Sequence, residues 1–283
     1  MVPTSLGSTA RRRIGIRFGL SMAAAWMNAT LGLLALRSPE GELLTPVPTA
    51  ITLAGALLLS SAFPLARYFR RFTARIKHRW QALSAGVAVA YVFVNIIPEL
   101  EVHRPIIAGS AMGALLDAEK RVYLWALAGF VTFVGLSRLR YLTPSRALGA
   151  SLVYWAEMAG YSLYTLLLGY LLVHREDATL LSLELFVFAI GLHLFMLDNE
   201  LAEQFEGGYE PRGRILLASF VLVGWVLGTA DAFPDFLTSR LFAFVVGGVV
   251  ITSANEELPV EEGGRLWWFV GGAAFYAILL MLI

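Results

Sequence analysis

The chain has 283 residues, of which 58% are hydrophobic and 15% are charged, and its formal net charge is +1. An ordinary soluble domain is about one-quarter charged, so this composition indicates a polytopic membrane protein. The absence of cysteine excludes disulfides, thiolate metal sites and cysteine catalysis. No basic segment is followed by a folded soluble module, so we expect the lipid bilayer as a partner and no nucleic acid.

Nine apolar stretches follow one another along the chain, each near the roughly 20 residues that a helix needs to cross the hydrocarbon core. These lengths favour helices over barrel strands, so we expect an all-α membrane protein. Prolines and glycines lie near the breaks, where helix-ending residues belong. The predicted spans are 15–36, 48–66, 81–99, 122–137, 149–173, 181–204, 214–231, 240–257 and 266–283.

The first span, 15–36, follows three consecutive arginines and fits either a retained helix or a signal peptide. The retained helix is favoured because the apolar run is long, is interrupted by Asn28 and lacks a clear small-residue cleavage site. We therefore predict two parts. Residues 1–47 form a cytoplasmic N-terminus with an extra helix, and residues 48–283 form one eight-helix membrane domain without an exact internal repeat.

The basic residues are distributed unevenly between the two sides of the predicted bundle. When successive loops are assigned to alternate sides, sixteen of the 22 Lys and Arg residues fall on one side. The positive-inside rule then places the N-terminus in the cytoplasm and the C-terminus outside. The expected location is the inner, or plasma, membrane of a bacterium.

The segment HLFMLDNELAEQF at 193–205 brings ionisable side chains into the end of the sixth span. Each such side chain in hydrocarbon costs about 2.5 to 3.5 kcal/mol on insertion scales and needs a partner. On a helix, His193, Glu200 and Glu203 share one stripe that suits a divalent cation, whereas Asp198 faces elsewhere. The alternatives are solvated carboxylates in the headgroup region and an interhelical hydrogen bond at the deeper His193.

Glu157 lies about eight residues into the fifth span, at a depth similar to that of His193 in the next, antiparallel span. If these two helices pack together, the side chains are expected to meet as a hydrogen-bonded pair, a proton relay or half of a metal site. Tyr161 and Tyr164 lie too deep for interfacial anchors, so we expect them to pack inside the bundle.

Two further groups of polar residues lie near the ends of spans. Asn95 and Glu99 fit either a helix-end polar pair or an extracellular gate for cations. Glu256 belongs to an acidic cluster that fits either a solvated face or a site that collects cations. The predicted ion pathway comprises Glu157, His193, Asn95, Glu99, Asp198, Glu200 and Glu256, and the predicted metal ligands are His193, Glu157 and Asp198.

With these residues in place, region 48–283 resembles the ZIP (Zrt/Irt-like) family of divalent metal transporters, which has eight core helices and an extracellular C-terminus. NIIPE at 95–99 and EELPV at 256–260 are similar to the H-L-L-P-E and E-L-L-P-E ends of the family's second and seventh core helices. HLFMLD at 193–198 keeps the first His and a carboxylate of the family's H-E-x-P-H-E motif, but it has Leu194, Met196 and Leu197 in place of Glu, Pro and His. The family's H-N-x-x-D-G motif is not restored around Glu157.

The resemblance implies a transporter of zinc or another divalent metal cation as substrate, through an altered site and without another cofactor. The alternative is a non-transporting ZIP-like protein that acts as an interaction or sensing module, with a homodimer as the expected assembly. We do not expect an enzyme, because the sequence has neither a G-x-S-x-G elbow nor an H-E-x-x-H pair.

Overall fold

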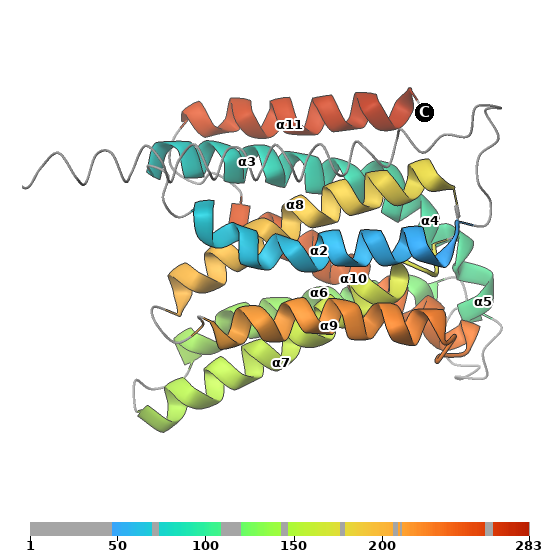
Figure 1. Ribbon diagram of the computed structural model, residues 1–283, viewed down its shortest axis with the longest axis horizontal. Coiled ribbons are helices and arrows are strands. Elements are labelled where there is room, and N and C mark those ends of the chain that lie inside the picture. Colours follow the sequence, from blue (N-terminus) through green and yellow to red (C-terminus); the bar gives the residue numbers. More distant parts are fainter. Residues whose placement is uncertain are drawn as a thin grey trace, which may run out of the picture.

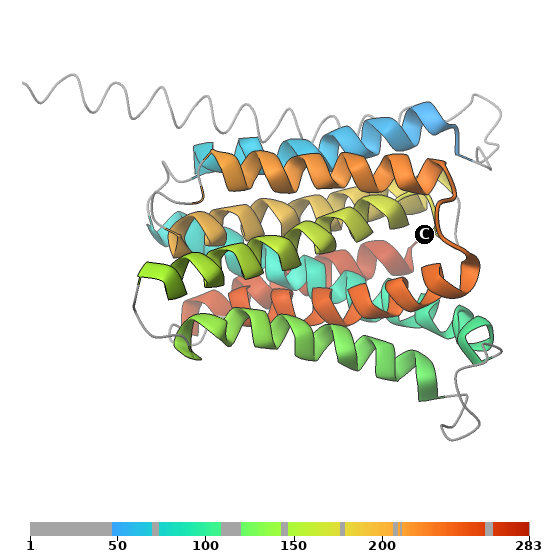
Figure 2. The same cartoon turned by 90° about the horizontal axis from the view of Figure 1, so that it is seen from below.

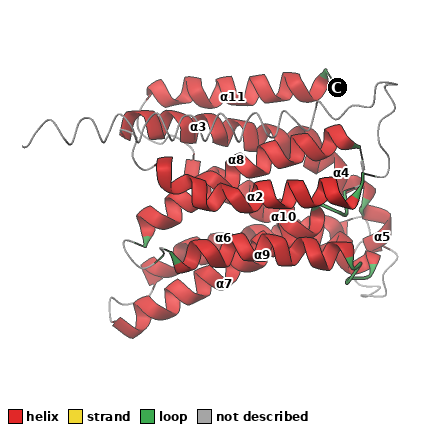
Figure 3. Ribbon diagram, viewed as in Figure 1, coloured by secondary structure: helices red, strands yellow, loops and turns green. Residues whose placement is uncertain are grey.

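The structure, a computed structural model, describes residues 47–69, 74–108, 120–142, 147–175, 179–205, 209, 211–257 and 263–282. No strand occurs in these ranges, so the all-α class is confirmed for them (Figure 3). The predicted first span, 15–36, lies outside the described residues.

Eight long helices overlap the eight spans predicted from residue 48 onward (Figure 1). Six described helical segments are long and apolar enough to cross a membrane, which is consistent with an all-α membrane protein, although nine spans are not confirmed. The long helices are α2 (Thr49–Phe69), α3 (Ala74–Tyr91), α6 (Arg121–Leu142), α7 (Ala147–Leu171), α8 (Leu180–Gln204), α9 (Arg212–Thr229), α10 (Asp235–Glu257) and α11 (Gly263–Met281).

The α3 helix does not end at Tyr91 but changes its hydrogen bonding there. It continues through a π-helical segment, η2 (Val92–Ile96), into α4 (Ile97–Val102), and α5 (Arg104–Ala108) follows. Pro98 has no N–H, and its ring crowds the carbonyl four residues earlier. The Ile97 N–H instead reaches the Val92 carbonyl, a π-helical bond that accommodates the proline.

Three helix pairs are in close contact because both helices contribute a glycine. A Cβ atom on any of these glycines would overlap a backbone carbonyl oxygen of the partner helix. Small residues of this kind let membrane helices approach closely. The pairs are α3 with α11 through Gly86 and Gly272, α6 with α10 through Gly129 and Gly247, and α7 with α9 through Gly169 and Gly224.

The helices form two four-helix units that also contact each other, since α3 packs on α8 as well as on α10. In the first, named the α8 unit, α7 packs on α9, and α2 packs on both α8 and α9. In the second, named the α10 unit, α10 packs on α6 and α3, and α3 packs on α11. The units meet where α8 contacts α3 and where α7 contacts α6 and α10.

The closest helix contacts in one half of the chain recur in the other half with the helix directions reversed. If α2, α3 and α6 are matched to α9, α10 and α11, and α7 to α8, the pair α3–α11 corresponds to α10–α6, and α7–α9 corresponds to α8–α2. Successive long helices alternate in direction, so each helix of the first set runs opposite to its counterpart (Figures 1 and 2). The closest contacts therefore follow the pattern of an inverted repeat, whereas the contact of α6 with α7 is not matched by one of similar extent between α11 and α8.

Candidate functional site

His193 is fully buried in the middle of α8, between the two units. Its Nε2 atom lies 3.1 Å from the Tyr164 hydroxyl oxygen of α7 and 3.4 Å from Thr252 Oγ1 of α10. The Thr252 hydroxyl also lies 2.8 Å from the Gly248 carbonyl oxygen, to which it donates. The side chains of Tyr164, His193 and Thr252 are named the His193 cluster. They form interhelical hydrogen bonds, one of the alternatives that the sequence left open for His193.

The other ring nitrogen of His193 is also buried. Nδ1 has no hydrogen-bond partner within the described ranges, and neither has the buried hydroxyl of Ser253, the residue after Thr252. Buried polar atoms are normally paired, and an unpaired one costs about 1 to 3 kcal/mol. The centre of the bundle therefore has hydrogen-bonding capacity that its own side chains leave unused.

A small cavity lies between the two units, about one helical turn from the His193 cluster. Leu168 of α7 and Val249 of α10 line it, and they are four and three residues from Tyr164 and Thr252. Its volume of about 20 Å³ suffices for one water-sized molecule. Most of the wall is apolar, and the lining also includes the charged residues Glu99 and Arg175.

Asn95 and Glu99 lie on the side of the His193 cluster where this cavity is found. Both are half-buried, and Glu99 lines the cavity. The Asn95 Nδ2 atom lies 3.4 Å from the hydroxyl oxygen of Tyr91, another lining residue. The η2 turn and α4 thus bring this predicted pair of residues to the boundary between the two units.

Glu157 does not meet His193, contrary to the sequence prediction. Its carboxylate is buried and accepts a hydrogen bond from Gln204, with 2.5 Å between Nε2 and Oε2. Gln204 lies eleven residues beyond His193, about 16 Å along α8. The antiparallel register of α7 and α8 places Tyr164, and not Glu157, opposite His193.

Asp198 is buried and forms an ion pair with Arg214, so the alternative of a solvated carboxylate in the headgroup region is wrong for this residue. Its two oxygens lie 2.9 and 3.1 Å from Arg214 Nε, and Oδ2 lies 2.6 Å from Nη2. The Tyr209 hydroxyl donates to Oδ1 at 2.6 Å. Asp198 therefore faces α9 and the loop before it.

Glu203, which shares the predicted stripe with His193, and the remaining pathway carboxylates Glu200 and Glu256 have varied environments. Glu203 is exposed and lies 3.0 Å from Lys77 Nζ, and it also accepts from Asn199 Nδ2 at 3.3 Å. Glu200 is half-buried. Glu256 belongs to the last turn of α10, but its side chain lies outside the described residues.

The predicted metal triad of His193, Glu157 and Asp198 is not assembled. Throughout the described ranges, no group of three or more His, Asp or Glu side chains is arranged to hold a metal ion. Glu157 is bonded to Gln204 and Asp198 to Arg214, so neither carboxylate adjoins the imidazole. The side chains near His193 are hydroxyls, which do not form the ligand sets typical of protein zinc sites.

Several partners in these clusters were not singled out from the sequence. Thr252 and Gln204 carry no motif, and Tyr164 was expected only to pack. Arg214 did carry a signal, since it follows Asp198 across a short connection and a carboxylate at membrane depth needs a partner. Glu184, a carboxylate that is only 5% exposed on α8, was also missed.

Fold and site together define an all-α bundle of two four-helix units with a buried polar cluster between them. No protein-family model matches the chain, and no curated protein matches it significantly. The resemblance to the ZIP family rests on the helix layout and the short motifs alone.

Proposed function

We propose that the chain is a membrane transporter whose solute passes between the α8 unit and the α10 unit, by way of the cavity near Glu99 and the His193 cluster. The observation that carries this proposal is the His193 cluster itself. It combines buried polar groups from both units near the middle of a helix long and apolar enough to cross a membrane. Intramembrane ionisable residues commonly mark substrate paths.

The inverted repeat supports the same proposal. Many secondary transporters are built from inverted repeats, with the substrate site near the bilayer midplane at the repeat interface. In this chain α7 and α8, which correspond to one another in the repeat, both contribute to the His193 cluster. Movement of one unit against the other would expose this cluster to each side in turn.

The resemblance to the ZIP family makes zinc or another divalent metal cation the first solute to test. A dication beside His193 would have one imidazole nitrogen and hydroxyl oxygens as neighbours, with no adjoining carboxylate among the described residues to offset its charge. Desolvating an uncompensated charge is costly, so we expect metal to bind weakly and transport to proceed through an altered site.

Metal content and uptake test this proposal. Purified protein is equilibrated with zinc, manganese, iron or cadmium and measured by elemental mass spectrometry, beside His193→Ala and the control His78→Ala. His78 is half-buried on α3 and contacts Gln81. The role of His193 is supported if the retained metal, or the uptake into liposomes, falls in His193→Ala but not in His78→Ala. Equal uptake of every solute in both variants contradicts it.

A second function is favoured by one observation, the ion pair between Asp198 and Arg214. This pair occupies the carboxylate that the family resemblance would assign to metal. A non-transporting membrane protein, assembled as a homodimer and acting as an interaction or sensing module, has no need of that ligand. Such a protein is expected to cross-link to itself and to give no flux in liposomes, whereas reproducible flux counts against this function.

A further inference from the structure

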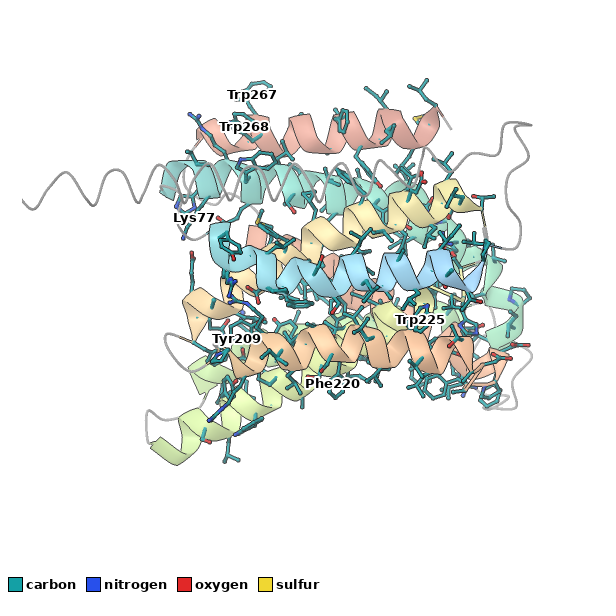
Figure 4. All side chains as sticks on the ribbon, viewed as in Figure 1. Lys77, Tyr209, Phe220, Trp225, Trp267 and Trp268 are labelled. Carbon is teal, nitrogen blue, oxygen red and sulfur yellow. The ribbon has the colours of Figure 1, made fainter. Side chains whose placement is uncertain are left out.

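Three exposed tryptophans gather at one end of the helix pair α3–α11. Trp80 is 44% exposed, Trp267 is 74% exposed and Trp268 is 42% exposed. In Figure 4, Trp267 and Trp268 lie near the same end of the bundle as Lys77. Large exposed indoles need a partner or an environment that suits them, since their rings are apolar and their N–H groups are polar.

The packing of the two helices places these tryptophans at one level. α3 and α11 run in the same direction (Figure 1). Gly86 lies against Phe269 and Ala273, and Gly272 lies against Leu83. Extended toward the start of both helices, this register sets residue 80 beside residues 267 and 268. Indoles at a common depth are typical of a membrane–water interface, where they reach the headgroup level.

Positive charge accompanies the tryptophans. The exposed Arg79 guanidinium lies 5.6 Å from the ring centre of Trp268. The sequence from residue 67 to residue 79 contains six Lys and Arg residues and no Asp or Glu. Basic clusters next to a membrane helix attract anionic lipid headgroups, and arginine pairs well with phosphate.

We propose that Arg79, Trp80, Trp267 and Trp268, named the tryptophan surface, bind the headgroup of an anionic phospholipid. The guanidinium donates to the lipid phosphate, while the indole rings lie along the upper acyl chains and headgroup. The cation–π contact with Trp268 holds the guanidinium at the edge of this surface. The proposal requires that the chain is embedded in a membrane but not that it transports a solute.

Tryptophan quenching in reconstituted vesicles tests this surface. The full chain is placed in phosphatidylcholine vesicles that contain phosphatidylglycerol, with bromine on the acyl chains of one lipid or the other at equal mole fraction. We expect brominated phosphatidylglycerol to quench more strongly than brominated phosphatidylcholine. One arginine near a membrane surface corresponds to about a fivefold local enrichment of anionic lipid, and this enrichment should be lost in Arg79→Gln.

Two variants make the assignment specific. Arg138→Gln removes an exposed arginine from the last turns of α6 and should keep the excess quenching by phosphatidylglycerol. The triple variant Trp80→Phe, Trp267→Phe and Trp268→Phe should lose the excess while its other four tryptophans still report quenching. Equal quenching by both lipids in the unsubstituted protein, or an excess that survives in Arg79→Gln, would overturn the proposal.

Discussion

The Asp198 carboxylate of α8 and the Arg214 guanidinium of α9 form a two-pronged ion pair inside the α8 unit. The shortest contact, from Nη2 to Oδ2, is 2.6 Å, and the side chains are 0% and 8% exposed. The Tyr209 hydroxyl adds a third hydrogen bond, at 2.6 Å. The pair thus joins the end of one long helix to the start of the next and holds the connection between them.

Removing either charge should destabilise the protein strongly. A buried charge that loses its partner costs about 3 to 5 kcal/mol, whereas replacing both members of a pair with neutral groups is often nearly neutral. We expect Asp198→Asn and Arg214→Met each to lower the thermal unfolding midpoint in detergent. The double variant should recover most of the loss, because the amide oxygen that replaces the carboxylate would still accept from Tyr209. This account would be contradicted if the double variant lowered the unfolding midpoint by the sum of the decreases in the two single variants.

Alkaline stability should depend on Tyr209. Burial, and then the nearby Asp198 carboxylate, raise the pKa of Tyr209 above its ordinary value of about 10. Because the pKa is raised on folding, the stability that the protonated hydroxyl contributes is fully present below about pH 10 and is lost as the pH rises beyond it. Tyr209→Phe should therefore lower the unfolding midpoint at neutral pH and lessen its further fall above pH 10. An equal fall in both proteins would disprove the link.

The glycine pairs should be intolerant of even a methyl group. A Cβ at Gly247 of α10 would overlap the Ala126 carbonyl of α6, and backbone cannot move aside as a side chain can. We expect Gly247→Ala to destabilise by about 1 to 3 kcal/mol in thermal unfolding. Gly135→Ala is the matched control on α6, since a Cβ there meets nothing within 4 Å. That change should stabilise by about 0.5 to 1 kcal/mol through helix propensity.

The long helices were predictable because apolar run length and helix-breaking residues are local properties of the chain. The start of α3 at Ala74, seven residues before the predicted start at 81, was not, since charged residues that form helices well extend α3 past the apolar run. The inverted repeat also could not be predicted from the sequence. What recurs is the contact between helix faces, and different side chains make each contact.

Depth along one helix could be read from the sequence, but register between two helices could not. His193 was expected to lie well inside its span, and it is near the middle of α8 and fully buried. Its partner depends on how α7 and α8 cross and slide, which their separate periodicities do not contain. This is why Tyr164 stands where Glu157 was expected. Likewise, the sequence predicted that Asp198 and His193 lie on different faces of their helix. It could not predict that Asp198 is buried against Arg214, because Arg214 lies on the neighbouring helix.

The ion pair between Lys77 and Glu203 joins the two units at the start of α3, whereas the cavity at Glu99 lies beyond the end of α3. Lys77 belongs to the α10 unit and Glu203 to the α8 unit, and their charged atoms are 3.0 Å apart. If the units move against each other as the proposed transport requires, we expect this ion pair to keep the two units together at the end of the bundle where Glu203 lies. Lys77→Glu should open that end, and the exchange Lys77→Glu with Glu203→Lys should close it again.

Thiol labelling measures this opening directly, because the chain has no cysteine of its own. Ser253→Cys places one thiol at a fully buried position of α10 beside the His193 cluster. A partly exposed ion pair contributes up to about 1 kcal/mol, so Lys77→Glu should speed maleimide labelling by up to about fivefold. Lys120→Glu changes an exposed lysine just before α6 and should leave the rate unchanged. If the charge exchange does not return labelling to the original rate, Lys77 acts on the labelled position by some route other than its contact with Glu203.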